Sequence, residues 1–312
     1  MKVAIFGASG FVGINVVDAL TKANIDVVAS DLKEMKFESA DFIKADLLDY
    51  DQVSKVVKGT DVIIHLAASP LPVSLEKPKF NARINIEGSL NIMDAARNNG
   101  IKKVIFSSAS SIVGEVKYNP VDEKHPCFPK TPYGVAKYAM EHYLRVYQEL
   151  YHLDYLIFRF FNVYGPWQYP ESKAVIPMVY NKLKTDGSFT IFGDGSQTRD
   201  FIYVGDIADF FVKASKNNVK NEIVNMGTGK ATTIKEIVEI AGKILDIKPK
   251  IINLPARPGE IGNFVADTNK LNKIFGVTPR INLYEGLADT FKWLNEYNQQ
   301  ISEKLDILSR GV

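Results

Sequence analysis

The order of apolar and polar positions in the first half of the chain predicts a parallel sheet covered by helices. Short apolar runs, rich in β-branched residues, have the length of buried strands and are expected at 3–6, 26–31, 61–67, 103–108 and 155–160. Helical patterns lie between them, among them 85–99, which ends at Gly100, and 133–151. Repeated β–α units favour an α/β fold with a doubly wound parallel sheet and helices on both faces.

The pattern becomes less regular after Gly165-Pro166, where the loops carry more proline, glycine and charge. A first domain over 1–165 and a smaller α/β substrate-binding domain over 166–312 are therefore predicted. Strands over 200–204 and 222–226 are expected to return to the first domain, and helices are expected over 233–245 and 284–299. The last dozen residues are polar and are expected to be frayed.

A glycine turn, Gly7-Ala-Ser-Gly10-Phe-Val-Gly13, follows the first strand. Gly7 suits a tight turn, Gly10 lets the main chain approach a bound group, and Gly13 lets the next helix pack near the strand. The free N–H groups and positive dipole end of that helix suit a pyrophosphate. The turn therefore predicts a Rossmann-type dinucleotide site that includes Phe11 and Val12, although its spacing is G-x-x-G-x-x-G rather than G-x-G-x-x-G.

Two acidic residues at strand ends extend this prediction. Asp31 ends the second strand about 20 residues past the turn, where a ribose-binding acid belongs. Because an acid there repels the 2′-phosphate of NADP, NAD is the expected cofactor. Asp46, with Leu47, is a candidate for the adenine. The alternative interpretation of Asp31 is an ordinary acid in a loop at the strand end, and Asp46 taken alone is weak evidence.

Ligands in open α/β sheets bind at the carboxyl ends of the strands. This rule places one group of residues on a single rim: Gly7, Asp31, Ala67, Ser107, Ser108 and Asn162.

Tyr133 and Lys137 are the candidate catalytic pair. They lie four residues apart in a predicted helix and therefore share a face. A free tyrosine has a pKa of about 10, and a nearby ammonium together with a positively charged nicotinamide favours the phenolate. Tyr133 is thus a candidate base near neutral pH. Alone, the pair would be an ordinary surface contact; after a dinucleotide motif, catalysis is the favoured interpretation.

Composition excludes several other functions. The formal net charge of +2 gives no electrostatic case for nucleic acid or an anionic membrane. No apolar run of about 18 residues suggests a membrane span, and no metal ligand set is expected because the four histidines lack metal-site spacing. The single cysteine, Cys127, permits no intrachain disulfide, and the amino terminus leads straight into a strand rather than a signal peptide. A cytoplasmic protein is expected.

In combination these motifs resemble the extended short-chain dehydrogenase/reductase family, and within it the NAD-dependent nucleotide-sugar epimerases and dehydratases, most of all UDP-glucose 4-epimerases. The resemblance runs from residue 1 to about 295. The motifs that carry it are Gly7-x-x-Gly10-x-x-Gly13, Asp31, His65-Leu-Ala-Ala68, Asn85-x-x-Gly88, Tyr133-x-x-x-Lys137, Phe161-Asn-Val-Tyr-Gly-Pro166, Gly193-Asp-Gly-Ser-Gln-Thr-Arg-Asp-Phe201 and Arg257-Pro-Gly-Glu260.

The resemblance implies inversion at C4 of a UDP-hexose through a transient 4-keto sugar, in a homodimer. Tyr133 would take the proton of the sugar 4-hydroxyl, NAD would accept and return the hydride, and Lys137 would bond the nicotinamide ribose and lower the tyrosine pKa. The further cofactor contacts that it implies are Leu66, Ala67, Ala68, Asn85, Ser107 and Phe161. The substrate contacts that it implies are Asn162, Arg199 and Arg257 at the diphosphate, Glu260 at the nucleotide ribose and Phe264 in the sugar pocket.

One segment departs from the family pattern. Family members carry Ser or Thr five residues before a Tyr-Gly glycine, but here alignment on Gly114 puts Ala109 in that position. Ser111 is the predicted substitute for the missing hydroxyl, and Ser108 matches only if the loop holds one extra residue. Dehydratases carry an Asp-Glu pair where this chain has Ser110 and Ser111, so elimination of water is disfavoured. A nucleotide-sugar 4-ketoreductase and a catalytically silenced NAD-binding regulator remain as alternatives.

Overall fold

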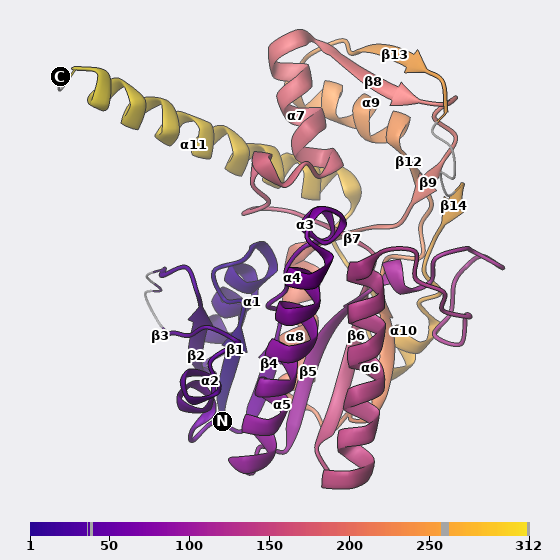
Figure 1. Cartoon of the computed structure of the whole chain (residues 1–312). Coiled ribbons are helices and arrows are strands. Elements are labelled where there is room, and N and C mark those ends of the chain that lie inside the picture. Colours follow the sequence, from indigo (N-terminus) through magenta and orange to yellow (C-terminus); the bar gives the residue numbers. More distant parts are fainter. Residues whose placement is uncertain (36, 38–39, 257–261, 311–312) are drawn as a thin grey trace.

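The computed structural model of the chain describes residues 1–35, 37, 40–256 and 262–310 (Figure 1). Its central feature is a seven-stranded sheet in the order β11-β6-β5-β4-β1-β2-β3, in which every neighbouring pair is parallel. This confirms the predicted Rossmann-type α/β fold. The strands are β1 (Lys2–Phe6), β2 (Asp26–Asp31), β3 (Asp41–Lys44), β4 (Val62–His65), β5 (Lys103–Ala109), β6 (Asp154–Phe160) and β11 (Glu222–Met226).

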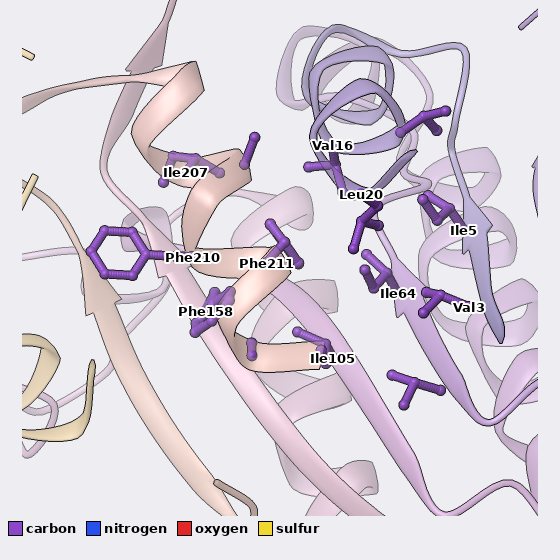
Figure 2. Close-up of a cluster of buried hydrophobic side chains, with 14 of the residues drawn as sticks. Val3, Ile5, Val16, Leu20, Ile64, Ile105, Phe158, Ile207, Phe210 and Phe211 are labelled. Atoms are coloured by element: carbon purple, nitrogen blue, oxygen red, sulfur yellow. The ribbon is translucent and has the colours of Figure 1, made fainter. Parts of the chain in front are cut away.

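Helices cover both faces of this sheet because its central strands are apolar on both sides. Val3 and Ile5 of β1 enter one core, and Ala4 and Phe6 enter the other. The first core is closed by α1 (Phe11–Lys22) and α8 (Val204–Lys216), whose Phe211 packs against β6 (Figure 2). The second is closed by α2 (Tyr50–Val57), α5 (Ser89–Asn98) and α6 (Pro132–Tyr151).

A smaller body lies beyond the carboxyl ends of the strands (Figure 1). Its own apolar core joins α7, α9 and the first half of α11 to one face of the two-stranded sheet of β8 and β13. The elements of this body are α7 (Val175–Asp186), β8 (Ser188–Phe192), α9 (Ile234–Leu245), β13 (Lys250–Leu254) and α11 (Leu283–Arg310). The remaining short strands between the bodies are β7 (Asn162–Tyr164), β9 (Thr198–Arg199), β10 (Phe201–Tyr203), β12 (Thr232–Thr233) and β14 (Asn263–Phe264).

Three elements differ from the expectations. Of the two strands expected to return to the first domain, β11 joins the large sheet beside β6, whereas β10 pairs with β7. The tail expected to fray continues α11 as far as Arg310. The helix expected from residue 85 begins earlier, because α3 (Leu71–Glu76), α4 (Pro78–Ala82) and a π-helical segment (Arg83–Gly88) precede α5. No helix in the described part of the chain combines the length and apolar composition needed to cross a membrane.

Candidate active site

The glycine turn between β1 and α1 is closed by backbone contacts that admit no side chain at two positions. Gly7 has a φ of +83°, and a Cβ there would lie 2.5 Å from the nitrogen of Ala67. A Cβ at Gly13 would lie 2.1 Å from the carbonyl oxygen of Gly7. A Cβ at Gly10, by contrast, would approach only that same oxygen, at 3.2 Å. Helix α1 begins here without a side-chain cap. The turn therefore presents open main chain and uncapped N–H groups at a helix start.

A cavity of about 330 Å³ opens beside this turn. The Asp31 carboxylate at its edge is held by two main-chain donors, the N–H of Ser9 at 3.1 Å and the N–H of Lys33 at 3.3 Å. The Ser30 hydroxyl, also on the lining, is buried and has no hydrogen-bond partner. The predicted cofactor residues that line the cavity are Gly7, Gly10, Asp31, Asp46, Leu47, Leu66, Ala67 and Ala68.

These features fit a dinucleotide. The glycine turn leaves space that a Cβ would occupy, so a pyrophosphate can approach the main chain. The Asp31 carboxylate can accept a hydrogen bond from a ribose hydroxyl and repels a 2′-phosphate. Ser9, Ser30 and Lys33 line the same cavity and were missed by sequence reasoning. Ser9 and Lys33 take part through backbone N–H groups, which leave no signature in the residue type.

Asn85 does not line this cavity, and its role differs from the predicted cofactor contact. Its amide accepts from the N–H of Ser69 at 2.7 Å and donates to the Ser69 carbonyl at 2.9 Å. Asn81, which sequence reasoning missed, donates to the same carbonyl at 2.9 Å. The two asparagines thus fix the segment that follows β4, which carries Ala67 and Ala68 on the cavity wall. Phe11 and Val12 also lie outside the lining.

The predicted catalytic pair lies on one face of α6. Thr131 caps this helix by accepting from the N–H of Gly134 at 3.1 Å. The Lys137 amine donates to the carbonyl of Ser107 on β5 at 2.6 Å and lies 5.8 Å from the centre of the Tyr133 ring. The Ser107 hydroxyl in turn donates to the carbonyl of His65 at 3.1 Å. These hydrogen bonds join the first turns of α6 to β5 and β4 at the rim formed by the carboxyl ends of the two strands.

Burial controls the protonation of this pair. It lowers the pKa of Lys137 to about 7 and raises the pKa of Tyr133 to about 12. The predicted lowering of the Tyr133 pKa is therefore not found in the protein alone, because loss of solvation outweighs the nearby amine. Burial, with a smaller contribution from the charge of Lys137, lowers the pKa of His65 to about 3. His65 is thus neutral at physiological pH.

The buried Lys137 amine has a consequence for stability. Its pKa falls from 10.5 to about 7 on folding, so between these values the unfolded chain binds one more proton than the native protein. Native stability therefore rises with pH across this window; the cost of burial is complete below pH 7 and absent above 10.5. We compare the unfolding free energy of the wild type with that of Lys137→Met. Above neutrality, the value for the wild type minus that for the variant is expected to rise by about 1 kcal/mol per pH unit. Urea unfolding of NAD-free protein measures it, and a difference that does not change with pH contradicts the lowered pKa.

A second cavity, of about 620 Å³, contains the segment that departs from the family pattern. Ser111 lies on its lining in a short 3-10 turn (Ser110–Ile112), and its buried hydroxyl has no hydrogen-bond partner. Gly134 lies close by, since a Cβ there would be 2.8 Å from the Ser111 carbonyl. The neighbour of Tyr133 is thereby held against Ser111. Phe264, the predicted sugar-pocket residue, also lines this cavity.

Ser108 does not reach this cavity. Its side chain is buried and its hydroxyl donates to Glu141 of α6 at 2.6 Å. The geometry gives no support to Ser108 as a substrate contact, because the strand turns it toward α6.

A third cavity, of about 400 Å³, carries Asn162, Arg199 and Phe161. The Asn162 amide donates to the Asp200 carbonyl at 3.0 Å, and an Arg199 Nη1 donates to the Thr198 carbonyl at 2.8 Å. Phe161 packs against Phe264 with the rings tilted and their centres 5.0 Å apart, so this cavity adjoins that of Ser111 across the ring pair. Phe161 thus faces the predicted substrate side rather than the glycine-turn cavity. Arg257 and Glu260 lie outside the described residues.

Comparison with known proteins defines the class of this site. The model of the NAD dependent epimerase/dehydratase family matches residues 3–227, and the chain belongs to this family. NAD is therefore its cofactor, in agreement with the glycine turn and Asp31.

The chain is similar to several sugar-nucleotide epimerases along nearly their whole length. The chain is 38% identical to a putative UDP-glucose 4-epimerase of Methanocaldococcus jannaschii, over 95% of this chain and 99% of that one. A UDP-N-acetylglucosamine 4-epimerase of Methanobrevibacter ruminantium, solved with UDP-N-acetylmuramic acid, superposes with a TM-score of 0.88 at 35% identity, covering 95% and 98%. A Thermus thermophilus UDP-glucose 4-epimerase solved with NAD gives 0.86 at 30% identity, covering 95% and 99%.

Proposed function

We propose that the protein is an NAD-dependent epimerase that inverts C4 of a UDP-hexose through a transient 4-keto sugar. The observation that carries this proposal is the placement of Tyr133 and Lys137 on one helix face, with the Lys137 amine bound to the Ser107 carbonyl. The pair lies near the end of β5, and Gly134, next to Tyr133, packs against the Ser111 carbonyl. The full-length similarity to UDP-sugar 4-epimerases supports the same reaction.

In this mechanism the Tyr133 phenol exchanges a proton with the sugar 4-hydroxyl. Bound NAD supplies the hydride acceptor and donor at C4. The protein alone holds the Tyr133 pKa at about 12, so the phenol is protonated until positive charge in the loaded site favours the phenolate. Lys137, with a pKa of about 7, exchanges its own proton near neutrality while the Ser107 carbonyl orients its amine.

The substrate diphosphate is assigned to the cavity that carries Asn162 and Arg199. A guanidinium fork suits phosphate oxygens, and Asn162 projects from the start of β7, directly after the end of β6. The Phe161–Phe264 pair separates this cavity from that of Ser111, which we assign to the sugar. Arg257 and Glu260 stay predicted substrate contacts.

Ser111 is proposed to supply the hydroxyl that Ala109 lacks. Its hydroxyl is buried without a protein partner, so it is available to a sugar oxygen. We expect Ser111→Ala to lower kcat by about 100-fold, as for loss of one donor at a developing oxyanion. Steady-state kinetics measure the change, with Ser110→Ala compared in parallel. If Ser110→Ala instead causes the larger loss, the neighbouring serine performs this role; if neither does, the substitution idea fails.

Two alternatives remain for the same scaffold. A 4-ketoreductase would consume reduced cofactor in net amounts, whereas epimerisation leaves total NAD unchanged. A silenced regulator would bind NAD without converting any sugar, and the intact Lys137–Ser107 contact speaks against it. Elimination of water is disfavoured, because residues 110 and 111 are serines and supply no carboxyl groups to act as acid and base.

The test combines ligand identification with product analysis. Mass spectrometry of ligands released from the purified protein is expected to show NAD, and NMR is expected to show C4 inversion of a UDP-sugar. UDP-glucose, UDP-N-acetylglucosamine and UDP-glucuronate are offered separately, because relatives named for each exist. Bound NAD without conversion of any of the three contradicts the proposal.

We also propose a homodimer. Four exposed apolar side chains on α6 lie within about 80° of one another at 100° per residue, which forms a continuous stripe. They are Val135, Tyr143, Val146 and Leu150. Leu75 and Phe80, on the adjacent α3 and α4, extend this apolar surface. Sedimentation equilibrium is expected to give twice the chain mass of 34.8 kDa, and the single chain mass would contradict the dimer.

A further inference from the structure

An ion pair is buried on the same face of α6 as the catalytic pair, one turn beyond Lys137. Arg159 of β6 donates from Nη2 to Oε2 of Glu141 at 2.7 Å and from Nε to Oε1 at 3.0 Å. The two side chains are 4% and 1% exposed. The Ser108 hydroxyl completes the arrangement with a third hydrogen bond to the same carboxylate, at 2.6 Å. Neither charged residue lines the cavities assigned to the cofactor or the substrate.

Glu141 continues the row begun by the catalytic pair. Tyr133, Lys137 and Glu141 are spaced by four residues, so their side chains lie one above another on the same face of α6. Ser108 and Arg159 are register partners on the neighbouring strands β5 and β6. One carboxylate of the helix is therefore bonded to two adjacent strands, one turn beyond the point where Lys137 is bonded to Ser107.

Arg159 also links the ion pair to the segment between β5 and α6, which lines the cavity assigned to the sugar. Its Nη1 donates to the Glu123 carbonyl at 3.1 Å, and the Glu123 carboxylate accepts from the N–H of Asn225 at 2.8 Å. The Asn225 amide donates to the Val121 carbonyl at 2.9 Å. Residues 121–123 belong to the connection between β5 and α6 that also supplies lining of the Ser111 cavity. The ion pair thus joins the catalytic helix to this connection and to two strands.

The stability of the fold is a weak explanation for burying these two charged side chains. A buried ion pair loses the hydration of two ions, and apolar residues of similar volume often stabilise such a site equally or better. The charged groups instead fix relative positions, because charge-assisted hydrogen bonds between a planar guanidinium and a carboxylate are short and directional. Apolar contacts would leave α6 freer to slide or rotate.

We infer that Glu141 and Arg159 are positioning residues that fix the axial position and rotation of α6, and through it the placement of Tyr133 and Lys137. The inference rests on the proposed epimerase function for its kinetic consequence only. Neither residue touches the reacting atoms.

The first test replaces the carboxylate by an amide of the same shape. In NAD-loaded protein, Glu141→Gln is expected to lower kcat by about 100-fold, as for small misplacements of catalytic groups, with KM and NAD content little changed. Glu149→Gln, the same change at an exposed position of the same helix, is the matched control and is expected to leave kcat unchanged. Wild-type kcat in Glu141→Gln overturns the inference.

A double variant separates positioning from stability. Glu141→Leu combined with Arg159→Met removes both charges, so it is expected to regain most of the Tm that Glu141→Gln loses. Its kcat is expected to stay depressed, because the directional bonds are gone. Recovery of kcat together with Tm would show that the pair serves folding alone and would overturn the inference.

A third readout is independent of epimerisation. Isotope-labelled lysine NMR follows the titration of Lys137, identified by its absence from Lys137→Met. Loosening of the Lys137–Ser107 contact in Glu141→Gln is expected to move the titration midpoint by about one pH unit or more relative to equally loaded wild type. An unchanged midpoint overturns the inference. If wild type converts no UDP-sugar but the midpoint moves, the proposed function fails while the positioning role stands.

Discussion

Replacing Tyr133 by phenylalanine is expected to lower kcat for the proposed C4 inversion by about 1,000-fold, while NAD content and Tm stay close to those of the wild type. The substitution removes only the phenol oxygen, so the ring that packs beside Lys137 is retained. Loss of a positioned acid–base group costs about 100- to 10,000-fold. Partial burial raises the pKa of Tyr133 to about 12, and phenylalanine has no group that can exchange a proton in its place.

NMR of product formation measures this effect, with cofactor content determined on the same samples. Tyr151→Phe, at the far end of the same helix, is the control, because Tyr151 is exposed and remote from the strand-end rim. Retention of wild-type kcat in Tyr133→Phe would show that another group moves the proton. A parallel loss of NAD would instead indicate that the phenol holds the cofactor.

Local patterns in the sequence were sufficient to predict that part of one group of strand-end residues meets at a common cavity. Gly7, Asp31 and Ala67 were predicted on one rim from strand ends alone, and the structure brings all three to the same cavity. This works because parallel strands end at a common edge, so the position of each strand in the chain determines which residues meet. The 2.5 Å separation between a Cβ built at Gly7 and the Ala67 nitrogen shows how close that meeting is.

Contacts between distant residues explain what sequence reasoning missed. In the run of serines near residue 110, nothing in the residue type distinguishes Ser108, which bonds Glu141, from Ser111, whose hydroxyl is unpartnered. Glu141 is one of several charged residues in a helical stretch, and its partner Arg159 lies 18 residues later in the chain, so local pattern gives no sign of the buried pair. The raised pKa of Tyr133 was missed for a related reason, since desolvation depends on the whole surrounding fold.

The second large effect is expected at Gly13. A methyl group there would lie 2.1 Å from the Gly7 carbonyl oxygen and 2.8 Å from both the carbonyl carbon and the Cα of Ala8. All three are backbone atoms, so the whole turn has to shift to admit it. We expect Gly13→Ala to weaken NAD binding by more than about 100-fold and to destabilise the fold by about 3 kcal/mol, the upper end for overpacking. Calorimetric titration with NAD and urea unfolding measure the two effects.

Gly10→Ala distinguishes loss of binding from loss of folding. A Cβ at Gly10 approaches only the Gly7 oxygen, at 3.2 Å, so this variant is expected to keep a Tm near that of the wild type. Its methyl group nevertheless occupies the open side of the turn, where the main chain approaches the pyrophosphate, and NAD affinity is expected to fall. If Gly13→Ala retained its NAD, or if Gly10→Ala bound NAD as the wild type does, the pyrophosphate would have to lie elsewhere than on the start of α1.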